Sequence, residues 1–280
     1  MTYKIIGDSC LDIAEEYRND EHFQIIPLTL QVEEKQFVDD ETFNQAEFLK
    51  AVSASPECPK SACPSPDAYL QAYKNADVDM VFVITLSQHL SGSYNSAMLA
   101  KTMYEEEVGD GKKIEVISSL SASVGETLIA LKIKELAESG RSFDSIVDKA
   151  YAFRDEMKTY FVLDTLETLR KNGRLTGIQA FFASALNIKP VMAGDKGHIV
   201  KLDQARGMNK ALAKMVDILI QQVPNTEDRV LAIAHCNCPE RAHMLKNLFL
   251  EKKAFKDVII VDTAGVSTMY ANDGGIVVAC

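Results

Sequence analysis

Two serines flank a glycine in the turn Ser91-Gly92-Ser93, which follows an apolar run at 80–86 and precedes a helical pattern at 94–107. The first amides of a helix have no partner within the helix, and the helix dipole places partial positive charge there. Hydroxyls beside these amides add donors, so such a turn suits the binding of an anion. Simple N-capping by Ser91 or Ser93 explains the same pattern, and both interpretations stay open.

Two further serine-rich segments occupy similar positions. Segment 118–123 holds four serines and follows an apolar run at 114–117, and segment 61–66 lies just before a helical pattern at 65–74. Because the carboxyl ends of parallel strands meet at one edge of a sheet, these segments could converge on one ligand site. They could also be separate helix caps. Ser123 stands three residues before Glu126, which is the spacing of a capping box.

Several catalytic and nucleotide-binding motifs are missing from the sequence. It has no Gly-x-x-x-x-Gly-Lys-[Ser/Thr] phosphate loop, no Gly-x-Gly-x-x-Gly turn and no Gly-x-Ser-x-Gly elbow. His89 precedes Ser91 by two residues, but side chains two apart on a turn seldom face one another. A transferase or hydrolase that acts on a small anion at the Ser91 helix stays the alternative to a binding protein.

Short apolar runs alternate with longer amphipathic segments, which is typical of an α/β fold. We expect strands at 3–6, 25–30, 80–86, 114–117, 160–163, 230–234, 258–261 and 276–279. Helices are expected at 65–74, 94–107, 123–139, 144–158, 166–171, 205–222 and 239–252. A length of 280 residues suits one large or two ordinary domains. We predict a Rossmann-like, parallel-sheet lobe at 1–160 and a mixed α/β lobe at 161–280, with the ligand between them.

The charge balance argues against some partners. Thirty Lys and Arg against forty Asp and Glu leave a net charge of −10, which repels nucleic-acid phosphates. No apolar segment approaches the roughly 20 residues of a membrane span, and residues 1–8 do not resemble a signal peptide. We therefore expect a cytoplasmic protein without stable membrane insertion. Its six cysteines lack the paired Cys-x-x-Cys spacing of a zinc module, so free thiols and no metal site are expected.

Taken in order, several motifs resemble those of the DegV family. Asp8-Ser-Cys-Leu-Asp12 is similar to its Asp-Ser-x-x-Asp opening, and Ser91-Gly-Ser-Tyr-Asn-Ser-Ala97 to its Ser-Gly-Thr-Tyr-x-Ser-Ala. Ser61-Ala-Cys-Pro-Ser-Pro66 resembles Thr-Ser-Gln-Pro-Ser-Pro, and Asn172-Gly-Arg-Leu175 resembles Gly-Gly-Arg-Ile. Pro27-Leu-Thr29, Asn187-Ile-Lys-Pro190 and Arg206-Gly207 also fit the pattern. The resemblance covers nearly the whole chain.

This resemblance implies a carrier of long-chain fatty acids rather than a catalyst. DegV-like proteins enclose the acyl chain between two α/β lobes, and a separate ATP-dependent fatty acid kinase phosphorylates the carboxylate. Carried over to this sequence, the resemblance implies that the carboxylate is held by Ser61, Ser91, Ser93 and Tyr270. It also implies that Arg174 and Arg206 dock the kinase, and that the bound fatty acid takes the place of any cofactor.

Two positions depart from the family pattern. Tyr270 stands where the family has a histidine near the carboxylate, and a phenol donates a hydrogen bond but does not become cationic. Ser61 replaces the more common threonine and keeps the hydroxyl. Met192, Met208, Met215, Phe181 and Phe182 are candidates to line the acyl tunnel, although most such residues belong to ordinary core.

Overall fold

A parallel four-stranded sheet forms the centre of the N-terminal half. The computed structural model describes residues 1–109, 111–175 and 187–280. Strand β1 (Tyr3–Asp8) lies between β2 (Phe23–Ile26) and β6 (Met80–Thr85), and β7 (Lys113–Ser118) pairs with the outer side of β6. Every residue of β6 is buried, which is why its sequence is a continuous apolar run rather than an alternating one.

Helices cover both faces of this sheet. On one face lie α3 (Pro66–Asn75) and α4 (Ser93–Val108), and on the other lie α5 (Val124–Glu138) and α6 (Phe143–Glu156). The short α1 (Glu15–Arg18) follows β1. We call the elements up to α6 the N-terminal lobe.

A small antiparallel sheet projects from the N-terminal lobe, and the sequence did not predict it. It consists of β4 (Lys35–Val38), β3 (Thr29–Val32) and β5 (Lys60–Ala62), with α2 (Gln45–Ala54) between β4 and β5 in the chain. The single strand expected at 25–30 was wrong. Pro27 stands between β2 and β3, which belong to different sheets, and proline has no N–H to donate to a ladder.

The C-terminal lobe is built on a mixed six-stranded sheet of order β10-β9-β8-β13-β11-β12. Its strands are β8 (Thr159–Val162), β9 (Ile188–Asp195), β10 (His198–Arg206), β11 (Val230–His235), β12 (Asp257–Asp262) and β13 (Ile276–Ala279). Helical segments are α7 (Glu167–Lys171), α8 (Met208–Gln222), η2 (Thr226–Asp228), α9 (Pro239–Leu250) and α10 (Gly265–Ala271). The helix expected from residue 205 begins later, because β10 continues in its hairpin with β9 as far as Arg206.

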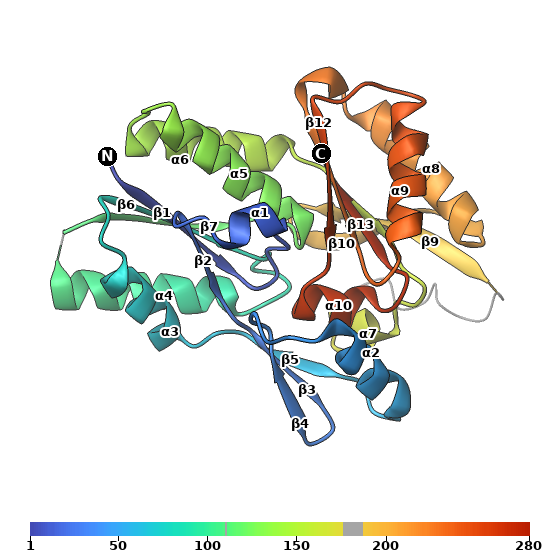
Figure 1. The fold of residues 1–280 in the computed structure, drawn as a ribbon, viewed down its shortest axis with the longest axis horizontal. Helices are drawn as coiled ribbons and strands as arrows, with labels where there is room; N and C mark the ends of the chain where they lie inside the picture. The colour runs from blue at the N-terminus through green and yellow to red at the C-terminus, as the bar shows by residue number, and fades with distance from the viewer. Residues whose placement is uncertain (110, 176–186) are drawn as a thin grey trace.

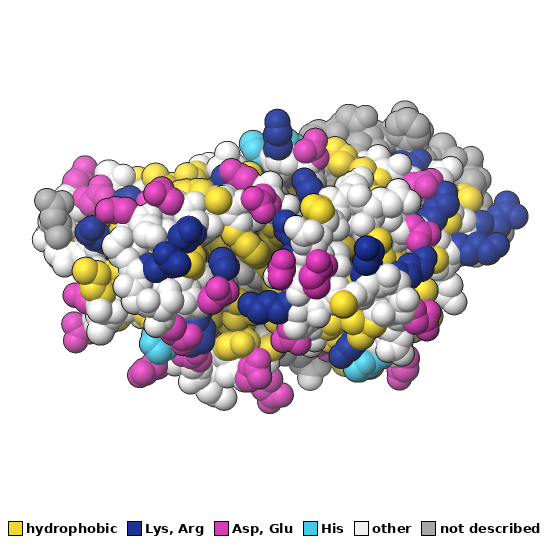
Figure 2. All heavy atoms as spheres, turned by 90° about the horizontal axis from the view of Figure 1, so that it is seen from above, with side chains coloured by type: hydrophobic (Ala, Val, Ile, Leu, Met, Phe, Trp, Pro, Cys, Tyr) yellow, Lys and Arg dark blue, Asp and Glu magenta, His cyan; other side chains and the backbone are white. Residues whose placement is uncertain are grey.

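The two lobes stand side by side, with α10 lying between them above β3 and β5 (Figure 1). On the face shown in Figure 2, acidic and basic side chains are interspersed and form no extended basic stripe. Within the described ranges, no helix has both the length and the apolar character needed to cross a bilayer. These features agree with the mixed α/β class expected from the sequence.

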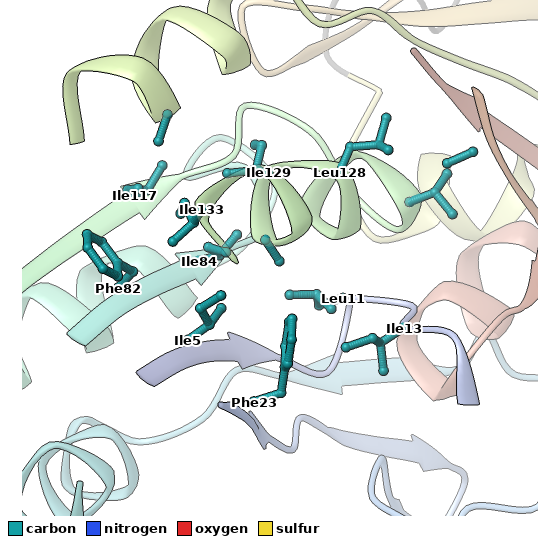
Figure 3. Close-up of a cluster of buried hydrophobic side chains, with 14 of the residues drawn as sticks. Ile5, Leu11, Ile13, Phe23, Phe82, Ile84, Ile117, Leu128, Ile129 and Ile133 are labelled. Carbon is teal, nitrogen blue, oxygen red and sulfur yellow. The ribbon is translucent and has the colours of Figure 1, made fainter. Parts of the chain in front are cut away.

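Helix α5 belongs to the core that joins the lobes. In one hydrophobic cluster, Leu128, Ile129 and Ile133 of α5 meet Ile5 and Ile84 of the parallel sheet (Figure 3). The same cluster includes side chains of the C-terminal sheet, namely Ala232, Ala234, Val261 and Ala279. Loss of volume on α5 should therefore weaken both lobes at once.

We predict that Leu128→Ala lowers the free energy of unfolding by about 2–5 kcal/mol, because it leaves a cavity at a fully packed position. Leu128 is 3% exposed, whereas Leu99 on α4 is 52% exposed and offers the same substitution outside the core. Leu99→Ala should cost less than about 1 kcal/mol. Urea unfolding followed by circular dichroism measures both values, and equal losses would contradict the placement of α5.

Candidate ligand-binding site

A cavity lined by both lobes lies between them. Its volume is about 110 Å³, and the surrounding space, counted with its open mouth, comes to about 800 Å³. The N-terminal lobe contributes the segment 120–123 and the side chains of Leu86 and Leu90. The C-terminal lobe contributes residues of β8, β9, β10, β13 and α10, among them Phe161, Ile199 and Val277.

Most of the cavity wall is apolar, and the hydroxyls within it bond to other protein groups. Ser121 Oγ lies 2.6 Å from Thr159 Oγ1, and Ser123 Oγ donates to Asp12 Oδ2 over 2.5 Å. A hydroxyl that already has a hydrogen-bond partner has little remaining capacity to bond to a ligand. This part of the cavity therefore suits a hydrocarbon.

Tyr270 and Arg174 line the cavity, and Ser61 contacts Tyr270 from outside the lining; we call these three residues the polar cluster. Ser61 Oγ lies 3.2 Å from the Tyr270 hydroxyl, although β5 and α10 are more than 200 residues apart in the chain. The Arg174 guanidinium lies 5.8 Å from the centre of the Tyr270 ring. Burial raises the pKa of Tyr270, while the Ser61 hydrogen bond and the Arg174 charge act in the opposite direction. Tyr270 is therefore a neutral donor at neutral pH.

Arg174 links this cluster to the turn before α4. Its Nε donates to the carbonyl of Leu90 over 3.1 Å, and its guanidinium also bonds to the carbonyl of Asn172. Ser91 follows Leu90 directly. Arg174 lines the cavity, so the residue expected at a kinase-docking surface supplies positive charge inside the site. Its docking role stays a prediction.

Ser91 and Ser93 form a pair of hydroxyls at the start of α4. Their Oγ atoms are 3.1 Å apart, and the Ser93 amide donates to Ser91 Oγ over 3.2 Å. Ser91 is partly exposed and Ser93 is fully buried. Ser65, in contrast, caps α3 by accepting from the amide of Ala68. Of the serine-rich segments, 61–66 thus contributes both a simple cap and a member of the polar cluster.

The turn between β9 and β10 closes the cavity against the N-terminal lobe. Ser87 Oγ donates to the carbonyl of Gly197 over 2.8 Å, and the rings of His89 and His198 stack with centroids 3.9 Å apart. Gly197 has a φ of +83°, and an added Cβ would lie 2.5 Å from Ser87 Oγ. Only glycine fits this contact. The His89 ring thus packs on His198, and among the described contacts no hydrogen bond joins it to Ser91.

Asp39 holds α10 in place between the lobes. Its carboxylate accepts hydrogen bonds from Ser9 Oγ and from the amides of Gly265 and Val266, at 2.8, 2.5 and 2.7 Å. An added Cβ at Gly265 would lie 2.6 Å from Asp39 Oδ1, so glycine is needed for this approach. Since α10 carries Tyr270, these bonds set the position of the phenol relative to Ser61.

The remaining predicted residues lie elsewhere or outside the described ranges. Arg206 is exposed at the end of β10, and its docking role stays a prediction. Met192, Met208 and Met215 belong to packed clusters of the C-terminal lobe, and Phe181 and Phe182 lie outside the described residues. All six cysteines are free, and no group of metal-ligating side chains is found among the residues that the structure describes.

Comparison with known proteins identifies the family. The family model described as "Uncharacterised protein, DegV family" matches residues 2–280. The chain belongs to the DegV family. A DegV domain-containing protein of Streptococcus pneumoniae is 35% identical over 283 residues, which covers 99% of this chain and 98% of the relative.

Solved DegV structures share the whole fold. A DegV-family protein from Ruminococcus gnavus, refined with vaccenic acid, is 49% identical, with a TM-score of 0.97 and full coverage of both chains. The Fatty Acid Kinase (Fak) B3 protein of Streptococcus pneumoniae, loaded with linoleic acid, is 34% identical, with a TM-score of 0.89. That match covers 100% of this chain and 99% of the other. The resemblance inferred from the sequence motifs is therefore confirmed at the level of family and fold.

We predict opposite pH dependences for two neighbouring aspartates. Burial raises the pKa of Asp39 to about 6, so the folded chain binds this proton more tightly than the unfolded chain, where the pKa is about 3.9. The contribution of Asp39 to stability is therefore fully present below about pH 4 and is lost as the pH rises through about 6. The stability advantage of the native chain over Asp39→Asn should shrink by about 2 kcal/mol between about pH 4 and pH 7.

Asp40 is the matched control. Hydrogen bonds from Thr42 lower its pKa, so its contribution is lost as the pH falls, and the advantage over Asp40→Asn should grow with pH. Urea unfolding at a series of pH values measures both differences. Trends of the same sign for both variants would contradict the burial of Asp39.

Proposed function

We propose that the chain binds a long-chain fatty acid between its lobes and presents the carboxylate to an ATP-dependent fatty acid kinase. The observation that carries the proposal is the lining of the cavity, which is mostly apolar and includes the polar side chains of Arg174 and Tyr270. A fatty acid has the same division into an apolar chain and a single anionic group. The transfer of phosphate is assigned to the kinase, and the chain itself acts as a carrier.

Elementary energetics support this division of roles. Burial of about 14 methylenes contributes on the order of 11 kcal/mol of gross transfer free energy. A carboxylate loses its hydration on entry and needs two or three donors in return. We expect Tyr270 and Arg174, which line the cavity, to provide such donors together with Ser61, which contacts Tyr270, and Ser91, which follows the Leu90 carbonyl bound by Arg174. The tail thus supplies affinity, and the head cluster fixes orientation.

The structural relatives support the ligand class. The Ruminococcus gnavus structure contains vaccenic acid, and a DegV-family protein from Eubacterium eligens, 28% identical with a TM-score of 0.90, is loaded with heptadecanoic acid. The name of the pneumococcal Fak B3 protein supports a kinase as the partner. We place the activity in the cytoplasm, where ATP is available to such a kinase.

The ligand and the cavity are tested together by extraction. Protein purified in a folded state and extracted with organic solvent should release about one fatty acid per chain, identified by mass spectrometry. Ala122→Phe should abolish this recovery, because Ala122 lines the cavity and an aromatic ring fills it. Ala54→Phe, at an exposed position on α2, makes the same change away from the cavity and should retain the lipid. Recovery of no fatty acid from the folded native chain would contradict the proposal.

The docking role of Arg206 is tested separately. Arg206 is exposed on β10, so Arg206→Ala should leave the recovery of fatty acid unchanged. The same change should lower acyl phosphate formation by an added fatty acid kinase at least about tenfold. A tenfold loss corresponds to about 1.4 kcal/mol of docking free energy, which is typical of an important interface arginine. Lys210→Ala removes a nearby exposed charge and serves as the control. Unchanged phosphorylation of the Arg206→Ala protein would exclude the docking role.

A further inference from the structure

Two carboxyl groups lie completely buried beneath the Ser91–Ser93 pair. Asp8 ends β1 and Glu126 lies in the first turn of α5, and neither side chain is exposed. Asp8 Oδ1 accepts from the amide of Cys10 and Oδ2 accepts from the amide of Leu86, both over 3.0 Å. Burial raises the pKa of Asp8 to about 6, while these two bonds act in the opposite direction and favour the ionised form.

Glu126 has no such support. Both of its carboxyl oxygens are buried, and neither has a hydrogen-bond partner among the described residues that meets ordinary geometry. The capping box expected from the sequence is wrong, because Ser123 has a φ of +58° and its hydroxyl donates to Asp12. An ionised, unpartnered carboxylate at this depth would be very costly. Burial, and then the charge of Asp8, raise the pKa of Glu126, so it is neutral at neutral pH.

Among the described residues named around the pair, none supplies a compensating positive charge. From the segment after β1, Cys10 and Asp12 face it, and burial raises the pKa of both. From α3, Tyr69 approaches Asp8 and is kept neutral by burial. From α4, the Ser93 hydroxyl faces Asp8. Asp8 and Glu126 therefore form a coupled pair that holds one proton and one negative charge.

Ser93 connects this pair to the head site. Its hydroxyl lowers the pKa of Asp8 against the larger effect of burial, and its Oγ lies 3.1 Å from Ser91 Oγ. An anion bound at Ser91 is thus separated from the buried charge of the pair by two hydroxyls. In an interior of low polarity, two negative charges at such a separation repel each other strongly. Binding of the anion must therefore raise the proton affinity of the pair.

We propose that Asp8 and Glu126 are positioning residues that take up a proton when a fatty acid carboxylate binds at Ser91. This inference rests on the proposed function. The proton enters the pair rather than the ligand, so the bound carboxylate stays ionised. That form is the nucleophile for phosphorylation: a carboxylate oxygen forms a bond to the γ-phosphorus of ATP while the bond to the ADP oxygen breaks. No proton has to leave the ligand in this step.

Proton uptake is measured by calorimetry. Decanoic acid, a soluble fatty acid, is titrated into the native, lipid-free protein at about pH 7 in two buffers that differ in ionisation enthalpy. We expect uptake of about one proton per bound ligand. The ¹³C NMR shift of decanoic acid labelled at the carboxyl carbon should show an ionised ligand in the complex.

The outcomes separate the inference from the proposed function. Absence of binding, with no lipid recovered by extraction, would contradict the proposed function. Binding without proton uptake, or uptake with a protonated ligand, would leave the carrier function intact and would overturn the role of the pair.

The pair itself is assigned with the double variant Asp8→Asn/Glu126→Gln, which removes both titratable groups and should bind decanoic acid without proton uptake. Persistent uptake by this variant would overturn the assignment. If the variant does not fold, infrared difference spectra of the native chain replace it. In the native chain, the carbonyl band of a protonated side-chain carboxyl should grow when the ligand binds. In the Glu126→Gln variant this band should differ from that of the native chain. Absence of the band in the native chain would also overturn the assignment.

Discussion

The position of α10 depends on the buried carboxylate of Asp39. It satisfies two amides at the start of α10 and one hydroxyl of the N-terminal lobe, so a helix of the C-terminal lobe is attached to the other lobe. A second buried carboxylate, Asp12, accepts from the amide of Ala264 over 2.6 Å and strengthens the same attachment. Without these bonds, α10 would lose this attachment to the N-terminal lobe, and the Tyr270 phenol would not be held next to Ser61.

Much of the fold could be predicted from the sequence, because its signals are local. Strand β6 is a continuous apolar run, and Ser65 precedes a proline and an amphipathic helix, so both elements follow from periodicity and capping. Elements whose stability comes from distant partners were missed or misplaced. The sheet that contains β5 pairs segments about 30 residues apart. The local hairpin of β9 and β10 was also missed, and its last two residues overlap the helix expected at 205–222.

The site residues stay predictions, although the structure brings two of them together. Ser61 and Tyr270 were named from motif order, and they are in contact. Arg174 was expected on a docking surface because the family resemblance implied it. Its place inside the cavity depends on the carbonyl of Leu90, which no local pattern indicates. Asp39 is followed by two more acidic residues, Asp40 and Glu41, and the sequence gave no sign of its burial.

The cavity wall is mostly apolar even though polar side chains lie at the strand ends and helix starts that form it. A long acyl chain needs a dry wall, yet every strand end and helix start that forms this wall brings hydroxyls and carboxyls with it. Here those groups are paired with one another, as Ser121 is with Thr159 and Ser123 with Asp12. Elsewhere in the lining the Arg174 guanidinium lies over the Tyr270 ring, 5.8 Å from its centre, and bonds to the carbonyls of Leu90 and Asn172. The positive charge beside the phenol is therefore that of a guanidinium, whose planar donors suit a carboxylate.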